Sequence, residues 1–242
     1  MRSPGTLEGR RLGGRRGLET LRRLGSAVVA NRFVFPEESK NLAEFIGILL
    51  GDGGITQSQA TITLNSIADK DYISYVGCLG ELLFGRKMSI YQRKREKATT
   101  LQLTGVLLIK FLMSIGLKQG NKVKQQVDVP EWIKQNTHYR IACTRGLMDT
   151  DGGIFLHKYK VNGKQYSYRK ICFTNKSRPL LQFVYDTLYS LKLTPKYGWE
   201  GDSKRVWVYD SYKTERYLDI IGSHNPRLFS WRVSQTAQGM VC

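Results

Sequence analysis

The chain has 242 residues, 41% of them hydrophobic, which is enough for one substantial domain or two small domains that share a core. Its formal net charge is +18, and this excess favours a polyanionic partner, nucleic acid above all, because Lys and Arg contacts release counterions from phosphates. No apolar run approaches the roughly 18 residues of a membrane span and no basic amphipathic helix stands out, so a membrane partner is disfavoured.

Residues 1–35 differ in composition from the rest of the chain. They contain "RRLGGRRGLETLRRLG", in which arginine pairs alternate with glycines and large apolar residues are few. We expect a basic, flexible N-terminal arm, either in contact with backbone phosphates or a solvated tail without function.

Residues 36–125 form the first predicted globular half. A helix is predicted over "LAEFIGILLG", with a stop at the glycines that follow it. A strand over "ATITLN" comes next, then a helix capped by Asp69. Two strands, "KMSIYQRK" and "TTLQLTG", flank the basic turn "REKA", and an apolar helix ends near Gly116.

Residues 126–139 are predicted to link this half to a second one, with a short helical turn at Pro130. The second half, residues 140–242, repeats the order of elements. A helix stops at Asp-Gly-Gly, a hairpin turns at Asn162-Gly163, a helix opens with Pro179, and a second hairpin and a closing helix follow. The sequence therefore predicts an α+β fold of two pseudo-symmetric halves, each with the order αββαββα.

The first helix of each half carries small residues four positions apart. These are Gly47 and Gly51 in the first half and Gly146 and Thr150 in the second. Residues four apart share one helical face, and small side chains there let two backbones approach closely. We expect the two helices to pack together on the pseudo-two-fold axis, which would place Asp52 and Asp151 side by side.

Two acids at adjacent helix C-termini are unfavourable, because the helix dipole is already negative there and each carboxylate repels the other. A bound cation relieves both effects, and hard oxygen ligands suit Mg²⁺. One Asp-Gly-Gly alone is typical of a turn. Two copies, each ending a helix in a strongly basic chain, favour metal-dependent cleavage of phosphodiesters.

The cysteines and histidines point to no other metal. Four cysteines and three histidines are present, without CxxC or Cys/His ligand spacing: Cys78, Cys143, Cys172, Cys242, His138, His157 and His224. We expect reduced thiols in an intracellular protein, cytoplasmic or organellar, that acts on DNA.

The two motifs, "FIGILLGDG" and "TRGLMDTDGG", resemble the signature nonapeptide of the LAGLIDADG homing endonucleases in their single-chain, two-motif form. Gly47 and Gly146 match its third position, and Asp52 and Asp151 match its acidic eighth. The resemblance covers about residues 41–232. It implies two four-stranded sheets that form a saddle over the DNA major groove, a monomer, and Mg²⁺-dependent hydrolysis of both DNA strands.

The resemblance also implies roles for particular residues. Asp52 and Asp151 would bind the metal, and the carbonyl groups of Gly51 and Thr150 would be additional ligands. Strand-end amides that position water or metal would be Asn65 and Asn175. Basic residues near the scissile bond would be Lys122, or Lys124 in its place, and Arg227. The sixth motif position is Leu50 in one copy and Asp149 in the other, so the two sites are expected to be unequal.

Polar side chains at period two along the predicted strands indicate a DNA-binding surface. We expect the candidates of the first region to share one face and those of the second region to share one face, and a third strand region adds further candidates. In this order, the three sets are Tyr91, Arg93 and Arg95; Lys158, Lys160, Lys164, Tyr166, Tyr168 and Lys170; and Lys196, Lys204, Trp207 and Tyr209. Gln92 and Gln165 are candidates to read adenine.

These observations favour a site-specific double-stranded DNA endonuclease, of the kind that makes an intron or intein mobile. Two alternatives stay open at this point. One is an intron RNA maturase, with intron RNA as its partner, and the other is a non-cleaving DNA-binding regulator on the same scaffold.

Overall fold

The computed structural model describes residues 33–93, 96–200 and 203–229, and isolated positions 6, 16, 17, 19, 20 and 23. Most of the predicted arm, residues 1–35, therefore lies outside the described residues, as does Arg95. The chain separates into two compact units, residues 1–34 and 35–242, and everything below concerns the second unit.

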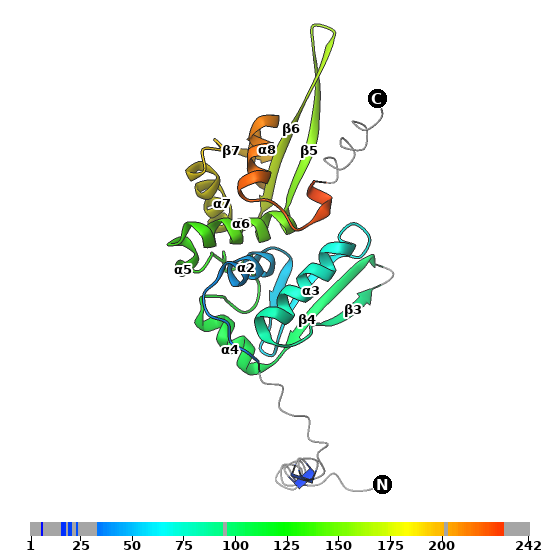
Figure 1. The fold of residues 1–242 in the computed structure, drawn as a ribbon, viewed down its shortest axis with the longest axis vertical. Helices are drawn as coiled ribbons and strands as arrows, with labels where there is room; N and C mark the ends of the chain where they lie inside the picture. Colours follow the sequence, from blue (N-terminus) through cyan, green and yellow to red (C-terminus); the bar gives the residue numbers. More distant parts are fainter. Residues whose placement is uncertain are drawn as a thin grey trace. The chain divides into compact units, whose positions relative to one another are not determined.

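The first half contains the predicted alternation of helices and strands (Figure 1). In chain order its elements are α2 (Lys40–Asp52), β1 (Gly53–Ile55), β2 (Gln59–Asn65), α3 (Lys70–Phe84), β3 (Ser89–Arg93), β4 (Ala98–Thr104) and α4 (Val106–Ser114). The strands form one antiparallel sheet in the order β1-β2-β4-β3. A short helix, α5 (Glu131–Lys134), follows Pro130 in the connection to the second half.

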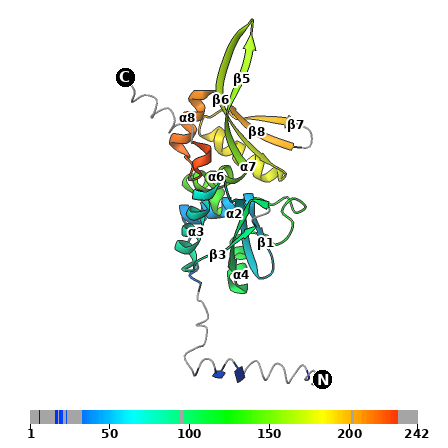
Figure 2. The ribbon, with the colours of Figure 1, turned by 90° about the vertical axis from the view of Figure 1, so that its right-hand side faces the viewer.

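The second half repeats this order. Its elements are α6 (Thr137–Asp151), β5 (Gly152–Val161), β6 (Lys164–Asn175), α7 (Arg178–Ser190), β7 (Lys196–Glu200), β8 (Ser203–Tyr209), α8 (Ser211–Ile220) and a 3-10 turn, η2 (Pro226–Leu228). The second antiparallel sheet has the equivalent order β5-β6-β8-β7. Its β5–β6 hairpin extends beyond the rest of the sheet (Figure 2) and turns at Asn162 and Gly163, which both have positive φ. The predicted α+β fold of two similar halves is confirmed.

Helices α2 and α6 lie against each other between the two sheets (Figure 1). Their glycines are required for this packing. A methyl group at Gly47 would collide with the carbonyl oxygen of Cys143, and one at Gly146 would collide with that of Glu44. The two backbones are therefore in direct contact, as the spacing of small residues predicts.

The apolar residues of both helices complete the core on either side of this contact. Ile46, Ile48, Leu49, Leu147 and Met148 are all buried. Because each helix contributes to the core of its own half and to the central contact, the two halves form one folding unit. Among the described helices, none is both long and apolar enough to cross a membrane.

One predicted helix cap is wrong in its contacts. Asp69 occupies the N-cap position of α3, but its side chain makes no capping hydrogen bond. Its carboxylate instead accepts hydrogen bonds from the backbone of Asn65 and from two side chains of the second half, Asn225 and Arg227. Asp69 therefore connects the two halves.

Candidate functional site

The central helix pair brings the two motif acids to the same end of the molecule. Helix α2 ends at Asp52 and α6 ends at Asp151, and in each half the next residue, a glycine, begins a strand. A methyl group built at Gly51 would lie 3.5 Å from Oδ2 of Asp151, so the second acid lies beside the last turn of the first helix. Both acids are partly buried.

The charges of these acids are poorly compensated within the protein. Burial, followed by the charge of Asp151, raises the pKa of Asp52 to about 6, against the opposing effect of Lys122. Burial also raises the pKa of Asp151, opposed first by the hydrogen bond from Asn175 and then by Lys122. Two partly buried carboxylates with raised pKa values form a site that a divalent cation would stabilise, and their hard oxygen atoms fit Mg²⁺ or Mn²⁺.

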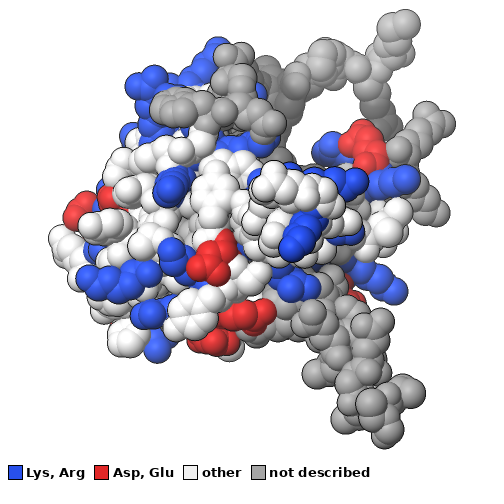
Figure 3. All heavy atoms as spheres, turned by 90° about the horizontal axis from the view of Figure 1, so that it is seen from above, with Lys and Arg blue, Asp and Glu red and all other residues white. Residues whose placement is uncertain are grey.

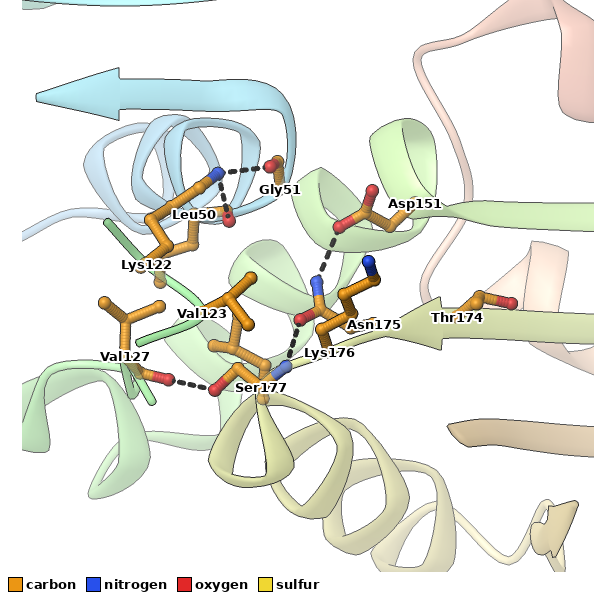
Figure 4. Close-up of a pocket in the computed structure, with 11 residues that line it drawn as sticks. Leu50, Gly51, Lys122, Val123, Val127, Asp151, Thr174, Asn175, Lys176 and Ser177 are labelled. Carbon is orange, nitrogen blue, oxygen red and sulfur yellow. Dashed lines mark hydrogen bonds between the residues drawn. The ribbon is translucent and has the colours of Figure 1, made fainter. Parts of the chain in front are cut away.

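The Lys122 side chain reaches the last turn of α2 (Figure 4). Its Nζ donates 2.8 Å to the carbonyl oxygen of Leu50 and also donates to that of Gly51. Burial lowers the pKa of Lys122, while the charges of Asp151 and Asp52 raise it. The Gly51 carbonyl, predicted as a metal ligand, is therefore occupied by an ammonium group in this structure.

The two strand-end amides differ. Nδ2 of Asn175 donates to Oδ2 of Asp151 at 2.7 Å, and its Oδ1 accepts from the backbone of Ser177 (Figure 4). The side-chain oxygen of Asn65 instead accepts from the backbone of Ile67 and Ala68, each at 3.0 Å. Asn175 thus contacts the acid of its own half, whereas the described contacts of Asn65 lie within its own turn.

A cavity of about 280 Å³ opens beside this group of residues. Its lining includes the polar groups of Gly51, Lys122, Asp151 and Asn175. A second cavity, of about 380 Å³, is lined by Asp151 and by Arg227, Arg205 and Trp207 among others. Asp151 therefore borders both cavities.

Arg227 reaches the site from the C-terminal end of the described chain. Its Nε lies 3.1 Å from Oδ1 of Asp69, and its Nη2 lies 3.5 Å from the carbonyl oxygen of Asp149. Its charge lowers the pKa of Asp52, although less than Lys122 does. Thr150, the remaining predicted ligand, folds its hydroxyl back onto the carbonyl groups of Gly146 and Leu147.

The strand register corrects the predicted DNA-binding face. In the hairpin, Val161 pairs with Lys164, so even-numbered residues of β5 share a face with odd-numbered residues of β6. Lys158 and Lys160 therefore lie on the face of the buried Ile171, whereas Lys164 and Lys170 lie on the opposite, open face. The expectation that these lysines share one face is wrong.

Lys204 also lies on the face opposite the open one. It shares that face of β8 with the buried Val206 and Val208, and it borders a cavity beside α7. Its neighbour Arg205 lies on the open face and approaches the ring of Trp207, with 5.8 Å between Cζ and the ring centroid. The sequence prediction missed Arg205.

Other predicted contacts divide between the two faces. Tyr91 and Arg93 share the open face of the first sheet, opposite the buried Ile62 and Leu101. Gln92 and Gln165, the candidate readers of adenine, do not lie on the open face. Each lies on the other face of its sheet. Lys and Arg side chains are spread widely over the face of the molecule seen in Figure 3.

No family model matches the sequence, and no curated protein matches it. Solved structures do match the fold. I-LtrWI, a LAGLIDADG homing endonuclease bound to target DNA, aligns with a TM-score of 0.58 at 10% identity, over 83% of this chain and 90% of that one. The LAGLIDADG meganuclease I-AabMI, bound to uncleaved DNA, aligns at 0.54 and 12%, over 81% and 92%.

I-DmoI, solved in complex with DNA and Mn, aligns with a TM-score of 0.53 at 15% identity, over 76% of this chain and 96% of that one. At identities this low, the structural matches show the fold alone. Together with the two motif helices at the centre of the fold, these matches confirm the resemblance noted in the sequence. The chain has the fold of the LAGLIDADG homing endonucleases, with both halves on one polypeptide.

Proposed function

We propose that the protein is a site-specific endonuclease that binds double-stranded DNA across its two sheets and hydrolyses phosphodiester bonds with a divalent metal. The observation that carries this proposal is the pair of partly buried acids, Asp52 and Asp151, at the joined ends of α2 and α6. The DNA and Mn present in structures of similar fold support it. We propose Mg²⁺ as the metal and a monomer as the active form.

The chain's own residues would divide the work. The carboxylates of Asp52 and Asp151 and the Thr150 carbonyl would hold the cation, and the Gly51 carbonyl would join them once Lys122 moves away. A bound divalent cation would supply Lewis-acid activation of water and would neutralise charge on the leaving oxygen. Asn175 holds Asp151 in place by its hydrogen bond. Lys122 and Arg227 would offset the negative charge that develops at the phosphate.

The proposed DNA contacts are the cations on the open faces of the sheets. These are Arg93, Lys164, Lys170, Lys196 and Arg205.

The predicted domain boundaries (an arm over 1–35, halves over 36–125 and 140–242, and a linker over 126–139) remain proposals, and α6 already begins at Thr137.

Selection of cleaved duplexes from a random DNA library in Mg²⁺ tests this function and identifies the target. Asp52→Asn and Asp151→Asn should each reduce double-strand cleavage by at least about 100-fold, because each removes a metal ligand. Affinity for the intact target in Ca²⁺ should change less than about twofold. Asp71→Asn, at an exposed acid of α3, is the matched control and should cleave normally.

The outcomes separate the alternatives. Wild-type cleavage by both motif variants would contradict the proposal. Selective duplex binding without cleavage by the unmodified protein would instead support a non-cleaving regulator. Selective binding of structured RNA alone would support a maturase.

A further inference from the structure

The segment that carries Arg227, residues 223–227, is fixed to both halves of the protein. Ser223 donates 2.5 Å from its hydroxyl to Oδ1 of Asp149, and the backbone N–H of His224 donates 2.9 Å to Oδ2 of the same carboxylate. Asp149 therefore binds two successive residues of the segment, and its carboxylate is engaged on both oxygens.

The remaining contacts of the segment continue across the boundary between halves. Nδ1 of His224 lies 2.6 Å from Oε1 of Glu44 on α2, and its ring packs on Tyr75. Nδ2 of Asn225, which is fully buried, donates to Asp69 at 2.8 Å and to the carbonyl of Asp149 at 3.0 Å. Residues 223–225, which precede the turn that carries Arg227, are therefore held by hydrogen bonds to both halves.

The equivalent position of the first half has a different residue. Leu50 matches Asp149 in the repeated motif, and it is a buried apolar side chain that lines the 280 Å³ cavity. Lys122, the counterpart of Arg227, contacts the Leu50 carbonyl, just as Arg227 approaches the Asp149 carbonyl. The backbone geometry is therefore similar in the two halves, but only the second half adds a carboxylate that binds the loop.

We propose that Asp149 is a positioning residue, which fixes residues 223–227 so that Arg227 is held against Asp69 of the first half. This inference rests on the proposed nuclease function, in which Arg227 offsets charge at one scissile phosphate. Asp149 itself is buried and faces the segment, so it acts through Arg227. It makes one of the two strand cleavages depend on a contact that the other does not have.

Glu44, Asp149 and His224 also offer three ligand-type atoms within 4.8 Å of one another. Their existing partners favour a hydrogen-bond network over a metal site. Oε2 of Glu44 accepts from Arg145 at 2.9 Å, and Tyr75 donates to Oε1 at 2.7 Å. A guanidinium next to the same carboxylate opposes the binding of a second cation.

The test compares Asp149→Leu, which introduces the residue of the first half, with Asp149→Asn. Asparagine keeps both contacts, because its oxygen can accept from His224 and its amide can donate to the Ser223 hydroxyl. Asp149→Leu should increase hydrogen exchange of the backbone amides of Ser223, His224, Asn225 and Arg227 at least about tenfold, and Asp149→Asn should change it little; Pro226 has no amide hydrogen. This readout needs no cleavage, so it tests the positioning even if the proposed nuclease function fails.

With a selected target, each strand is labelled separately. Asp149→Leu and Arg227→Met should slow the same strand by about 10- to 100-fold, leave the other strand nearly unchanged and accumulate nicked duplex. The double variant should be no slower than Arg227→Met alone. Leu188→Ala, a core change in α7 that lies outside the segment, controls for lost stability and should affect both strands equally.

Three results would overturn the proposal. The first is unchanged exchange of 223–227 in Asp149→Leu. The second is equal slowing of both strands in that variant, as in Leu188→Ala. The third is exchange of the segment that rises in the unmodified protein when a chelator is added, because this would show that a metal holds Glu44, Asp149 and His224 together.

Discussion

At the scale of single residues, burial disfavours the charged form of both motif acids. The pKa of Asp52 is raised to about 6, chiefly by burial and then by the charge of Asp151. The folded protein therefore keeps a proton on this carboxyl at pH values at which the unfolded chain has released it. A carboxyl whose pKa is raised in the folded state stabilises the fold fully at pH values below its ordinary pKa. This contribution is lost as the pH rises through the raised pKa.

We therefore expect the free energy of unfolding of the metal-free protein to fall by about 2–3 kcal/mol between pH 4 and pH 6.5, from this group alone. Asp52→Asn should lack that part of the fall, because an amide does not titrate. Urea unfolding of both proteins in EDTA across this pH range measures the difference. Parallel pH profiles for the two proteins would show that the pKa of Asp52 is not raised.

The sequence predicted that Asp52 and Asp151 each lie at the end of a helix, because a repeated helix end is a local feature. It could not predict which other polar side chains lie beside them. Asp69 looks like a helix cap in the sequence, yet its carboxylate binds Asn225 and Arg227 from the far end of the chain. Contacts of this kind depend on how distant segments meet, which no local pattern contains.

At the scale of elements, the contact between α2 and α6 sets the distance between the acids. A Cβ at Gly47 would lie on the carbonyl oxygen of Cys143, and the backbones would have to separate to admit it. Gly77 on α3 offers a comparison, because a Cβ there would meet only Leu101 Cδ2, at 3.6 Å. The same substitution should therefore have opposite effects at these two helical glycines.

Gly47→Ala should lower the free energy of unfolding by about 1–3 kcal/mol, the usual cost of overpacking. Gly77→Ala should leave it unchanged or raise it by up to about 1 kcal/mol, because alanine favours the helix. Chemical denaturation of the two variants measures both values. Equal stabilities would show that the helix backbones are not in contact at Gly47.

The strands show where sequence periodicity is sufficient and where it fails. Within β8 the alternation of Val206 and Val208 with Trp207 already assigns Arg205 to the open face, so this residue could have been found from sequence. Across the hairpin, the two-residue turn exchanges odd and even positions, so a count that continues through Asn162-Gly163 assigns Lys158 and Lys160 to the wrong face.

At the scale of the whole molecule, a net charge of +18 predicts strong binding to any polyanion. Specific DNA binding requires that particular cations face the duplex. The open faces of the two sheets differ in how these cations are placed. On the second sheet, Lys170 and Arg205 lie near the ring of Trp207, and the Lys170 Nζ lies 4.3 Å from the ring centroid. The ring attracts these cations, and in the proposed DNA complex they would be available to a phosphate or a base edge.

The hairpin provides two lysine pairs of equal charge on opposite faces, which tests the orientation of the bound DNA. The double variant Lys164→Gln/Lys170→Gln, on the open face, should reduce the magnitude of the salt-dependence slope of target binding by about 2, because each phosphate contact contributes about 0.9. Lys158→Gln/Lys160→Gln removes the same charge from the opposite face and should reduce it by less than half as much. Titrations of labelled target DNA over a series of salt concentrations measure both slopes. A larger effect of the Lys158/Lys160 pair would mean that DNA lies against the other face of the hairpin, and the proposed saddle would then be wrong for this half.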